Sequence, residues 1–133
     1  MHYGDILALI GLGFGAALGL GALFSPDWAA GIVRLKPDPE KPGGYSEFRA
    51  TYGGLFLMVH LAAFVIVLHA PPPMALMAVL PIAAGWLGAA MGRVVSMVLD
   101  RAKGGDAKII PIWMGTEIAL GLAIAAPILQ FTA

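Results

Sequence analysis

Four long apolar stretches, separated by short polar breaks, run along the chain. They cover about residues 6–24, 46–69, 73–99 and 109–131. A helix that crosses a membrane needs about 20 mostly apolar residues, and each stretch has about that length. No run alternates apolar and polar residues, so the pattern does not favour a membrane barrel. The sequence predicts an all-α integral membrane four-helix bundle that forms a single transmembrane domain over residues 1–133.

Positive charge gathers in two of the connections. The loops over residues 25–45 and 100–108 hold six of the eight lysines and arginines, at Arg34, Lys36, Lys41, Arg101, Lys103 and Lys108. The N-terminus, the proline-rich hairpin between the second and third stretches and the C-terminus hold none. Basic loops stay on the cytoplasmic side of a membrane. We therefore expect both loops to be cytoplasmic and both termini to face outward. Between Asp27 and Leu35 we expect a short interfacial helix.

Small residues recur every four positions in three of the stretches. The three series are Gly11, Gly15 and Gly19; Ala84, Gly88, Gly92 and Ser96; and Gly115, Ala119 and Ala123. Small residues at this spacing let helix backbones approach closely in a membrane. We expect tight packing through these stripes. They serve either the packing of the bundle itself or, for one stripe such as that of the first helix, a homo-oligomer.

The composition excludes several classes of function. The chain is 59% hydrophobic and 12% charged, with a formal net charge of zero, so no electrostatic argument favours nucleic acid as a partner. It contains no cysteine, which excludes disulfide, thiol-redox and thiolate-metal chemistry. No histidine pair or carboxylate-rich helix is spaced to bind a metal. We therefore predict no metal site, no cofactor and no catalytic residue.

A few ionisable residues interrupt the apolar stretches. Arg93 and Glu117 lie well inside the third and fourth, whereas Glu47 and Arg49 lie at the start of the second. Charges at bilayer depth are costly and mark a bundle interior, a cavity or a pathway. Counted from the cytoplasmic helix ends, Arg49, Arg93 and Glu117 fall in one layer. We expect Arg93 to pair with Glu117, and Arg49 to pair with Glu117 or Asp100.

Each of these residues also has a purely structural interpretation. Glu47 is a first-turn acid favoured by the helix dipole if Ser46 caps the helix. Arg49 can extend to the lipid headgroups, and Asp100 suits a helix end. A structural ion pair and a functional site explain Arg93 and Glu117 equally well. His60 suits a hydrogen bond between helices.

Tyr52 and His60 complete the predicted cluster. Arg49 and His60 share one stripe of the second stretch, and Tyr52 lies one turn from Arg49. The predicted ligand-binding or structural polar cluster is Arg49, Arg93, Glu117, Glu47, Tyr52, His60 and Asp100.

The segment Glu47–Gly54 (EFRATYGG) resembles the E-x-R-A-x-Y-G-G signature of the DUF4345 family of small bacterial four-helix membrane proteins. The resemblance continues in the Phe24-Ser25-Pro26 turn, in Gly92-Arg93 with Ser96 and Asp100, and in Glu117. The family is distantly similar to DoxX-like proteins. The resemblance implies a multi-pass fold in the bacterial cytoplasmic (inner) membrane, surrounded by lipid, but it implies no activity.

Three functions remain open. The first is a binding or transport module in which the Arg/Glu cluster holds a lipid, a quinone or a small anionic ligand. The second is an accessory or assembly subunit of a larger membrane complex, in which the charges only specify the bundle. The third is an enzyme that uses Glu117 or His60 as a proton carrier. It ranks last, because no nucleophile–base pair or metal set supports it.

Overall fold

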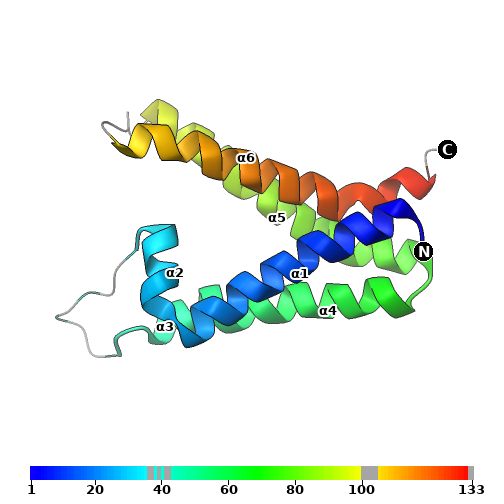
Figure 1. The fold of residues 1–133 in the computed structure, drawn as a ribbon, viewed down its shortest axis with the longest axis horizontal. Coiled ribbons are helices and arrows are strands. Elements are labelled where there is room, and N and C mark those ends of the chain that lie inside the picture. The colour runs from blue at the N-terminus through cyan, green and yellow to red at the C-terminus, as the bar shows by residue number, and fades with distance from the viewer. Residues whose placement is uncertain (36–37, 39, 41–42, 100–104, 132–133) are drawn as a thin grey trace. The chain divides into compact units, whose positions relative to one another are not determined.

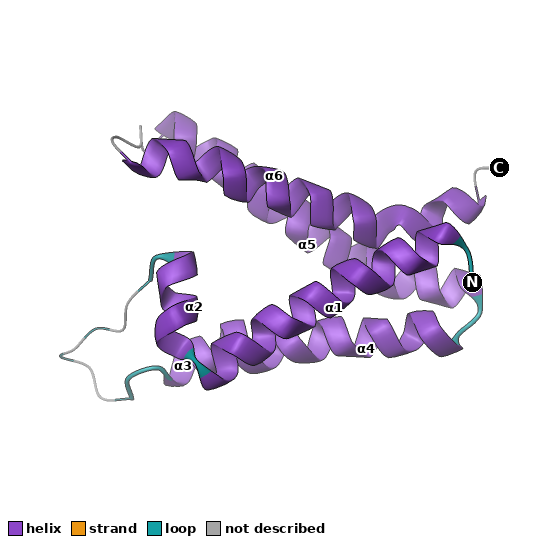
Figure 2. Ribbon diagram, in the orientation of Figure 1, coloured by secondary structure: helices purple, strands orange, loops and turns teal. Residues whose placement is uncertain are grey.

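Helices make up all the regular structure in the described part of the chain (Figure 2). The computed structural model describes residues 1–35, 38, 40, 43–99 and 105–131, with the backbone alone for residues 105–108. In chain order the elements are α1 (Tyr3–Phe24), α2 (Pro26–Val33), α3 (Ser46–Phe48), the π-helix η1 (Arg49–Leu55), α4 (Phe56–His69), α5 (Pro72–Leu99), α6 (Gly105–Ala125) and the 3₁₀-helix η2 (Ala126–Phe131).

Four of the helical segments are long and apolar enough to cross a membrane. They are Tyr3–Phe24, Ser46–His69, Pro72–Leu99 and Ile109–Phe131. The second is continuous through α3, η1 and α4, and the fourth runs from α6 into η2. The predicted all-α membrane class and its four long helices are therefore confirmed. The short helix expected after the first span is α2.

The chain forms two compact units. The first contains Met1–Gly11 and Ile66–Ala133, and the second contains Leu12–Val65. Helices α1 and α4 each contribute to both units, whereas α5 and α6 belong wholly to the first. The predicted single domain stays a prediction.

In the first unit, α5 and α6 run side by side (Figure 1). Gly121 of α6 lies so close to the Leu87 side chain and the Ala83 carbonyl that a Cβ added to Gly121 would stand 2.8 Å from Leu87 Cγ. Farther along, Arg93 of α5 meets Glu117 of α6. The partner number falls from 121 to 117 as the α5 number rises from 87 to 93, so the two helices are antiparallel.

The start of α1 and the end of the chain lie together in the same unit. The backbone N–H of His2 donates to the Asp5 carboxylate at 2.7 Å, which satisfies an N–H before the first turn of α1. The other Asp5 oxygen accepts a hydrogen bond of 2.6 Å from the Gln130 side-chain amide in η2. Gly4 packs directly on the backbone of Ala126. These contacts tie the first span to the last.

In the second unit, α1 packs against the second span through its glycine stripe. Gly15 lies against the His60 ring and Gly19 lies against the backbone of Leu57. Farther up the stripe, in the first unit, Gly11 meets the side chain of Ile124. The stripe predicted on the first helix therefore serves packing within the chain. This outcome is the first of the two alternatives that the sequence left open.

The glycines of the stripes predicted on the third and fourth helices make no close contact within the described part of the chain. A Cβ added to Gly88, Gly92 or Gly115 would meet no described atom within 4 Å. Where α5 and α6 meet, the small residues in close contact are Ala83 and Gly121, and neither belongs to the predicted series. The physical reason is that every face of a membrane helix is apolar, so the spacing of small residues does not tell which face meets a neighbouring helix.

Candidate functional site: the Arg93–Glu117 pair

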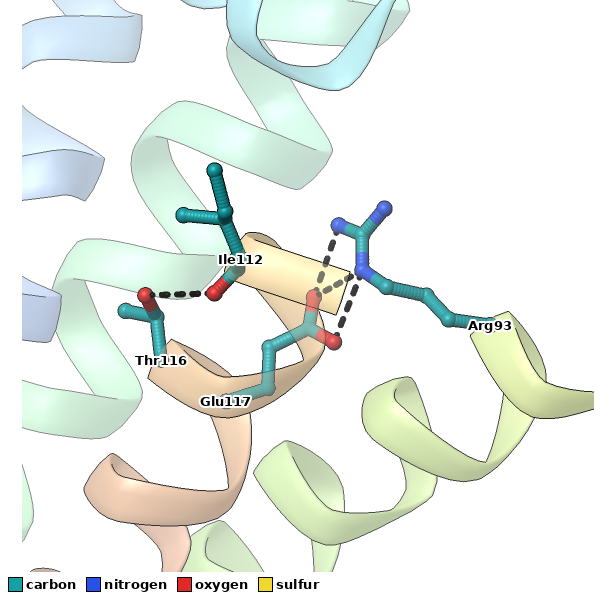
Figure 3. Close-up of polar contacts among 4 residues, drawn as sticks. All are labelled: Arg93, Ile112, Thr116 and Glu117. Carbon is teal, nitrogen blue, oxygen red and sulfur yellow. Dashed lines mark hydrogen bonds and ion pairs between the residues drawn. The ribbon is translucent and has the colours of Figure 1, made fainter. Parts of the chain in front are cut away.

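An ion pair joins the C-terminal half of α5 to the middle of α6. Nε of Arg93 donates to both oxygens of the Glu117 carboxylate, at 2.8 Å each. Nη2 of Arg93 lies 2.7 Å from Oε1 of the same carboxylate. Figure 3 shows the carboxylate beside one edge of the guanidinium. The predicted pairing of Arg93 with Glu117 is confirmed.

The pair lies inside the candidate spans. At 1.5 Å per residue, Arg93 is roughly 9 Å from the end of α5 at Leu99, and Glu117 is roughly 12 Å from the start of its span at Ile109. Because α5 and α6 are antiparallel neighbours, Arg93 and Glu117 lie at a similar level and their side chains meet. A lone charge at this depth would cost several kcal/mol, and the partner offsets much of that cost.

The two partners are buried to different degrees. The Glu117 side chain is 8% exposed, whereas the Arg93 side chain is 33% exposed. An arginine carries more N–H donors than this one-edged contact uses. In the described part of the chain, Nη1 of Arg93 has no partner, and it points away from the carboxylate (Figure 3). In this site the buried Glu117 carboxylate holds one edge of the Arg93 guanidinium, and the edge that carries Nη1 is accessible.

Thr116 lies next to the buried acid on α6. Its hydroxyl donates to the Ile112 carbonyl one turn earlier, at 3.0 Å (Figure 3). Such a bond within the helix satisfies the hydroxyl without a partner on another helix. Among the described residues, no buried side-chain nitrogen or oxygen lacks a hydrogen-bond partner. The accessible edge of Arg93 is thus the feature of this region that is open to a ligand.

Arg49 has a different partner in the second unit. Its Nη1 donates to the backbone carbonyl of Leu23, in the last turn of α1. A helix C-terminus leaves its last carbonyls without partners inside the helix, and a cation there is also favoured by the helix dipole. The pairing of Arg49 with Glu117 or Asp100 stays a prediction, because Arg49 and Glu117 belong to different units and Asp100 lies outside the described residues.

His60 is 2% exposed and is held by its own helix and by α1. Its Nδ1 lies 2.7 Å from the carbonyl of Phe56, one turn earlier, and its ring centroid is 4.3 Å from that of Phe56. The glycine at position 15 leaves the space that the imidazole occupies. His60 therefore packs closely against α1, and the hydrogen bond between helices that the sequence led us to expect stays a prediction.

A polar and aromatic cluster lies at the start of the second span. The Tyr45 hydroxyl donates to the Asp27 carboxylate, and this hydrogen bond, followed by burial and the charge of Asp27, raises the pKa of Tyr45 above its ordinary value. The Tyr45 ring meets Phe48 edge-on at 5.9 Å, and Phe48 meets the Tyr52 ring at 4.9 Å. Tyr52, predicted beside Arg49, is thus the end of an aromatic row.

Glu47 lies in the first turn of α3 and is exposed. The residue at the N-cap is Tyr45, and it makes no side-chain capping bond. The expectation that Ser46 caps this helix is therefore wrong, since the helix begins at Ser46 itself. The position of Glu47 in the first turn agrees with its interpretation as an acid favoured by the helix dipole.

The described residues contain no group of three or more His, Cys, Asp or Glu side chains placed to hold a metal ion. A family model described as a domain of unknown function, DUF4345, matches residues 5–126. The chain belongs to the DUF4345 family. No curated protein and no solved structure matches it.

In this DUF4345 chain the EFRATYGG segment has a defined structural form. It occupies α3 and most of η1, the π-helix over Arg49–Leu55. Its arginine reaches the Leu23 carbonyl, and its first glycine, Gly53, lies against the Leu23 backbone. Both residues therefore meet α1 one residue before the Phe24-Ser25-Pro26 turn. π-Helical turns are frequent at functional sites, but here the described contacts are with α1.

Sequence reasoning missed two polar contacts of the DUF4345 chain. The Asp27–Tyr45 hydrogen bond joins the residue after Pro26 to the residue before Ser46. The Asp5–Gln130 hydrogen bond joins the first span to the last. In each case the signal is a polar residue at the very end of an apolar stretch. Such a signal marks a residue that needs a partner, but it does not say which one.

Proposed function

We propose that the chain is a binding or transport module of the bacterial inner membrane, which holds the polar end of a lipid, quinone or small anionic ligand at the Arg93–Glu117 pair. The observation that carries the proposal is the accessible edge of Arg93, inside a candidate span and held in place by a buried acid. An arginine fixed in this way presents N–H donors in a rigid plane, which is the geometry that oxygen acceptors bind.

The position of the accessible Arg93 edge inside a candidate span is the reason that we expect it to bind a ligand. In hydrocarbon there is no water to accept a hydrogen bond, and an unsatisfied donor costs several kcal/mol. Glu117 accepts from Nε and Nη2 of Arg93 but leaves Nη1 exposed. A polar atom of a bound molecule would satisfy the remaining donors. The apolar remainder of that molecule would lie among the exposed apolar side chains of α5, such as Val94 and Val95.

The proposed route of access follows from the distribution of basic residues. With both basic loops in the cytoplasm, the pair lies in the cytoplasmic half of the bilayer. Ligand would then enter from the cytoplasm or from the inner leaflet. This topology is part of the proposal, and reporter fusions to the loops and to the C-terminus test it.

Native mass spectrometry of the protein, purified in mild detergent, tests the proposed function. We expect wild-type protein to retain an amphiphile that Arg93→Gln loses while still folding. Arg34→Gln is the matched control, because it removes the same charge from a described residue after α2, outside the spans. Retention of the same amphiphile by Arg93→Gln would contradict the proposal.

A second candidate function has one observation in its favour. Gly85, Gly88 and Gly92 leave an open strip on α5, where an added Cβ would meet no described atom. Exposed small residues at helical spacing suit the docking of another helix. In this case the chain is an assembly subunit and the ion pair only specifies the bundle. If the chain is an assembly subunit, Gly88→Leu should release a partner chain or a second copy. If the chain is instead the binding module proposed first, Gly88→Leu should leave the amount of bound amphiphile unchanged.

A further inference from the structure

We infer that the group anchored by Arg93 is an uncharged hydrogen-bond acceptor, such as the carbonyl of a lipid ester or of a quinone, and not an anion. This inference rests on the proposed function of the Arg93–Glu117 pair and narrows its ligand class. It depends on the charge balance of the site, on the position of the exposed nitrogen and on the depth of the pair in its spans.

The charge of Arg93 is already balanced. Glu117 contacts Arg93 through both of its oxygens, so the pair has no net charge. Among the residues of the first unit whose side chains the structure describes, Arg93 is the only arginine or lysine. An anion at the exposed edge would therefore place two negative groups on one cation. In a medium of low dielectric constant, such a triad leaves one negative charge uncompensated.

A neutral carbonyl avoids this problem. It accepts a hydrogen bond from Nη1 without changing the charge of the site, and a hydrogen bond from a charged donor is stronger than one from a neutral donor. It also needs little desolvation, because an ester or quinone carbonyl already resides in the membrane. The buried acid thus has two effects: it orients the guanidinium, and it selects against anions.

Glu117 is the residue that sets this preference. Glu117→Gln keeps the shape of the side chain and removes its charge, which leaves Arg93 as an unbalanced cation. The variant should then favour an anionic headgroup over a neutral one. The predicted inversion separates a selective role of Glu117 from a merely structural one, because simple loss of the fold would lower the retention of every amphiphile equally.

Decanoate and its methyl ester are suitable probes, because they share one apolar chain and differ in headgroup charge. Native mass spectrometry of detergent-solubilised protein, at a pH where decanoate is ionised, would count each probe retained. We expect wild-type protein and Arg34→Gln to retain about tenfold more ester than decanoate. We expect Glu117→Gln to invert that ratio and Arg93→Gln to retain neither probe.

The outcomes distinguish the inference from the function on which it rests. Equal or greater retention of decanoate by the wild type, with loss of both probes in Arg93→Gln, would overturn the neutral-ligand inference and leave the binding site intact. Retention of both probes by Arg93→Gln would overturn the proposed function itself. If the single variants fail to fold, the double variant Arg93→Met with Glu117→Met replaces the pair with apolar side chains of similar length. If this double variant retained the ester at the wild-type level, the proposed function and the neutral-ligand inference would both be overturned.

Discussion

The imidazole of His60 occupies the space that any side chain on Gly15 would need. The two residues lie on α1 and α4, and the ring is 2% exposed. A buried polar ring this close to a helix backbone is possible only where the facing residue lacks a Cβ. The contact explains why the first-helix stripe contains a glycine at position 15, where alanine would otherwise favour the helix.

Gly15→Ala should destabilise the protein by about 1–3 kcal/mol, because the new methyl group overlaps the ring and forces it to shift. Gly13→Ala is the matched control on the same helix, since its Cβ would meet only the Phe64 ring at 3.7 Å. The control should be neutral or slightly stabilising. Unfolding in detergent, followed by circular dichroism, measures both. Equal effects of the two substitutions would contradict the His60 contact.

Substitution by alanine should destabilise the protein at Gly53 but not at Gly54. A Cβ on Gly53 would stand 3.0 Å from Leu23 Cα, against backbone that cannot move cheaply, whereas a Cβ on Gly54 would meet only the Arg49 carbonyl, at 3.8 Å. Gly53→Ala should therefore cost about 1–3 kcal/mol. Gly54→Ala should be neutral or add up to about 1 kcal/mol, because alanine favours helices. The same unfolding assay checks the pair, and a stabilised Gly53→Ala would contradict the close approach to Leu23.

A double-mutant cycle measures the Arg93–Glu117 coupling. Arg93→Met and Glu117→Met should each destabilise the protein, because each leaves a charge without its partner at bilayer depth. The double variant should be less destabilised than the sum of the two, with a coupling energy of about 1–3 kcal/mol. The partial exposure of Arg93 places the expected value toward the lower end. Additive single effects would mean that the contact contributes no stability.

The Tyr45–Asp27 hydrogen bond predicts a dependence on alkaline pH. The bond is the main cause that raises the pKa of Tyr45 above its ordinary value of 10.0. The stability that it contributes is therefore present below that value and is lost as the pH rises through the raised pKa. Subtracting the tyrosinate absorbance of Tyr45→Phe from that of the wild type gives the titration of Tyr45. Its midpoint should lie above pH 10.0, and Asp27→Asn should bring the midpoint back toward 10.0. A difference curve centred at or below 10.0 would contradict the contact.

The termini should both face away from the cytoplasm. The Asp5–Gln130 hydrogen bond joins the start of the first span to the end of the last, so the two ends share one side of the membrane. The basic loops predict which side that is. A reporter that is active only outside the cytoplasm should be active when fused after Ala133 and inactive when inserted at residue 38. The reverse pattern would overturn the predicted orientation and, with it, cytoplasmic access to the site.

Sequence and structure agree where local properties decide. Arg93 and Glu117 are recognisable as unusual because each interrupts an apolar stretch, and their similar depths along consecutive helices predict that they meet. Arg49 shows the limit of this reasoning. Its depth alone allowed an acidic partner, but the described partner is the Leu23 carbonyl, a backbone atom that no side-chain pattern reveals.

The sequence by itself determined the class of the protein, its four spans and the pairing of Arg93 with Glu117. It could do so because a bilayer acts on each residue through its polarity, and a charge in hydrocarbon needs a partner within reach. Only the tertiary structure decided that Gly15 accommodates His60, that Gly88 and Gly92 make no such contact, and that one edge of Arg93 is accessible. Those features depend on how each helix is rotated toward its neighbours, and hydropathy does not specify that rotation.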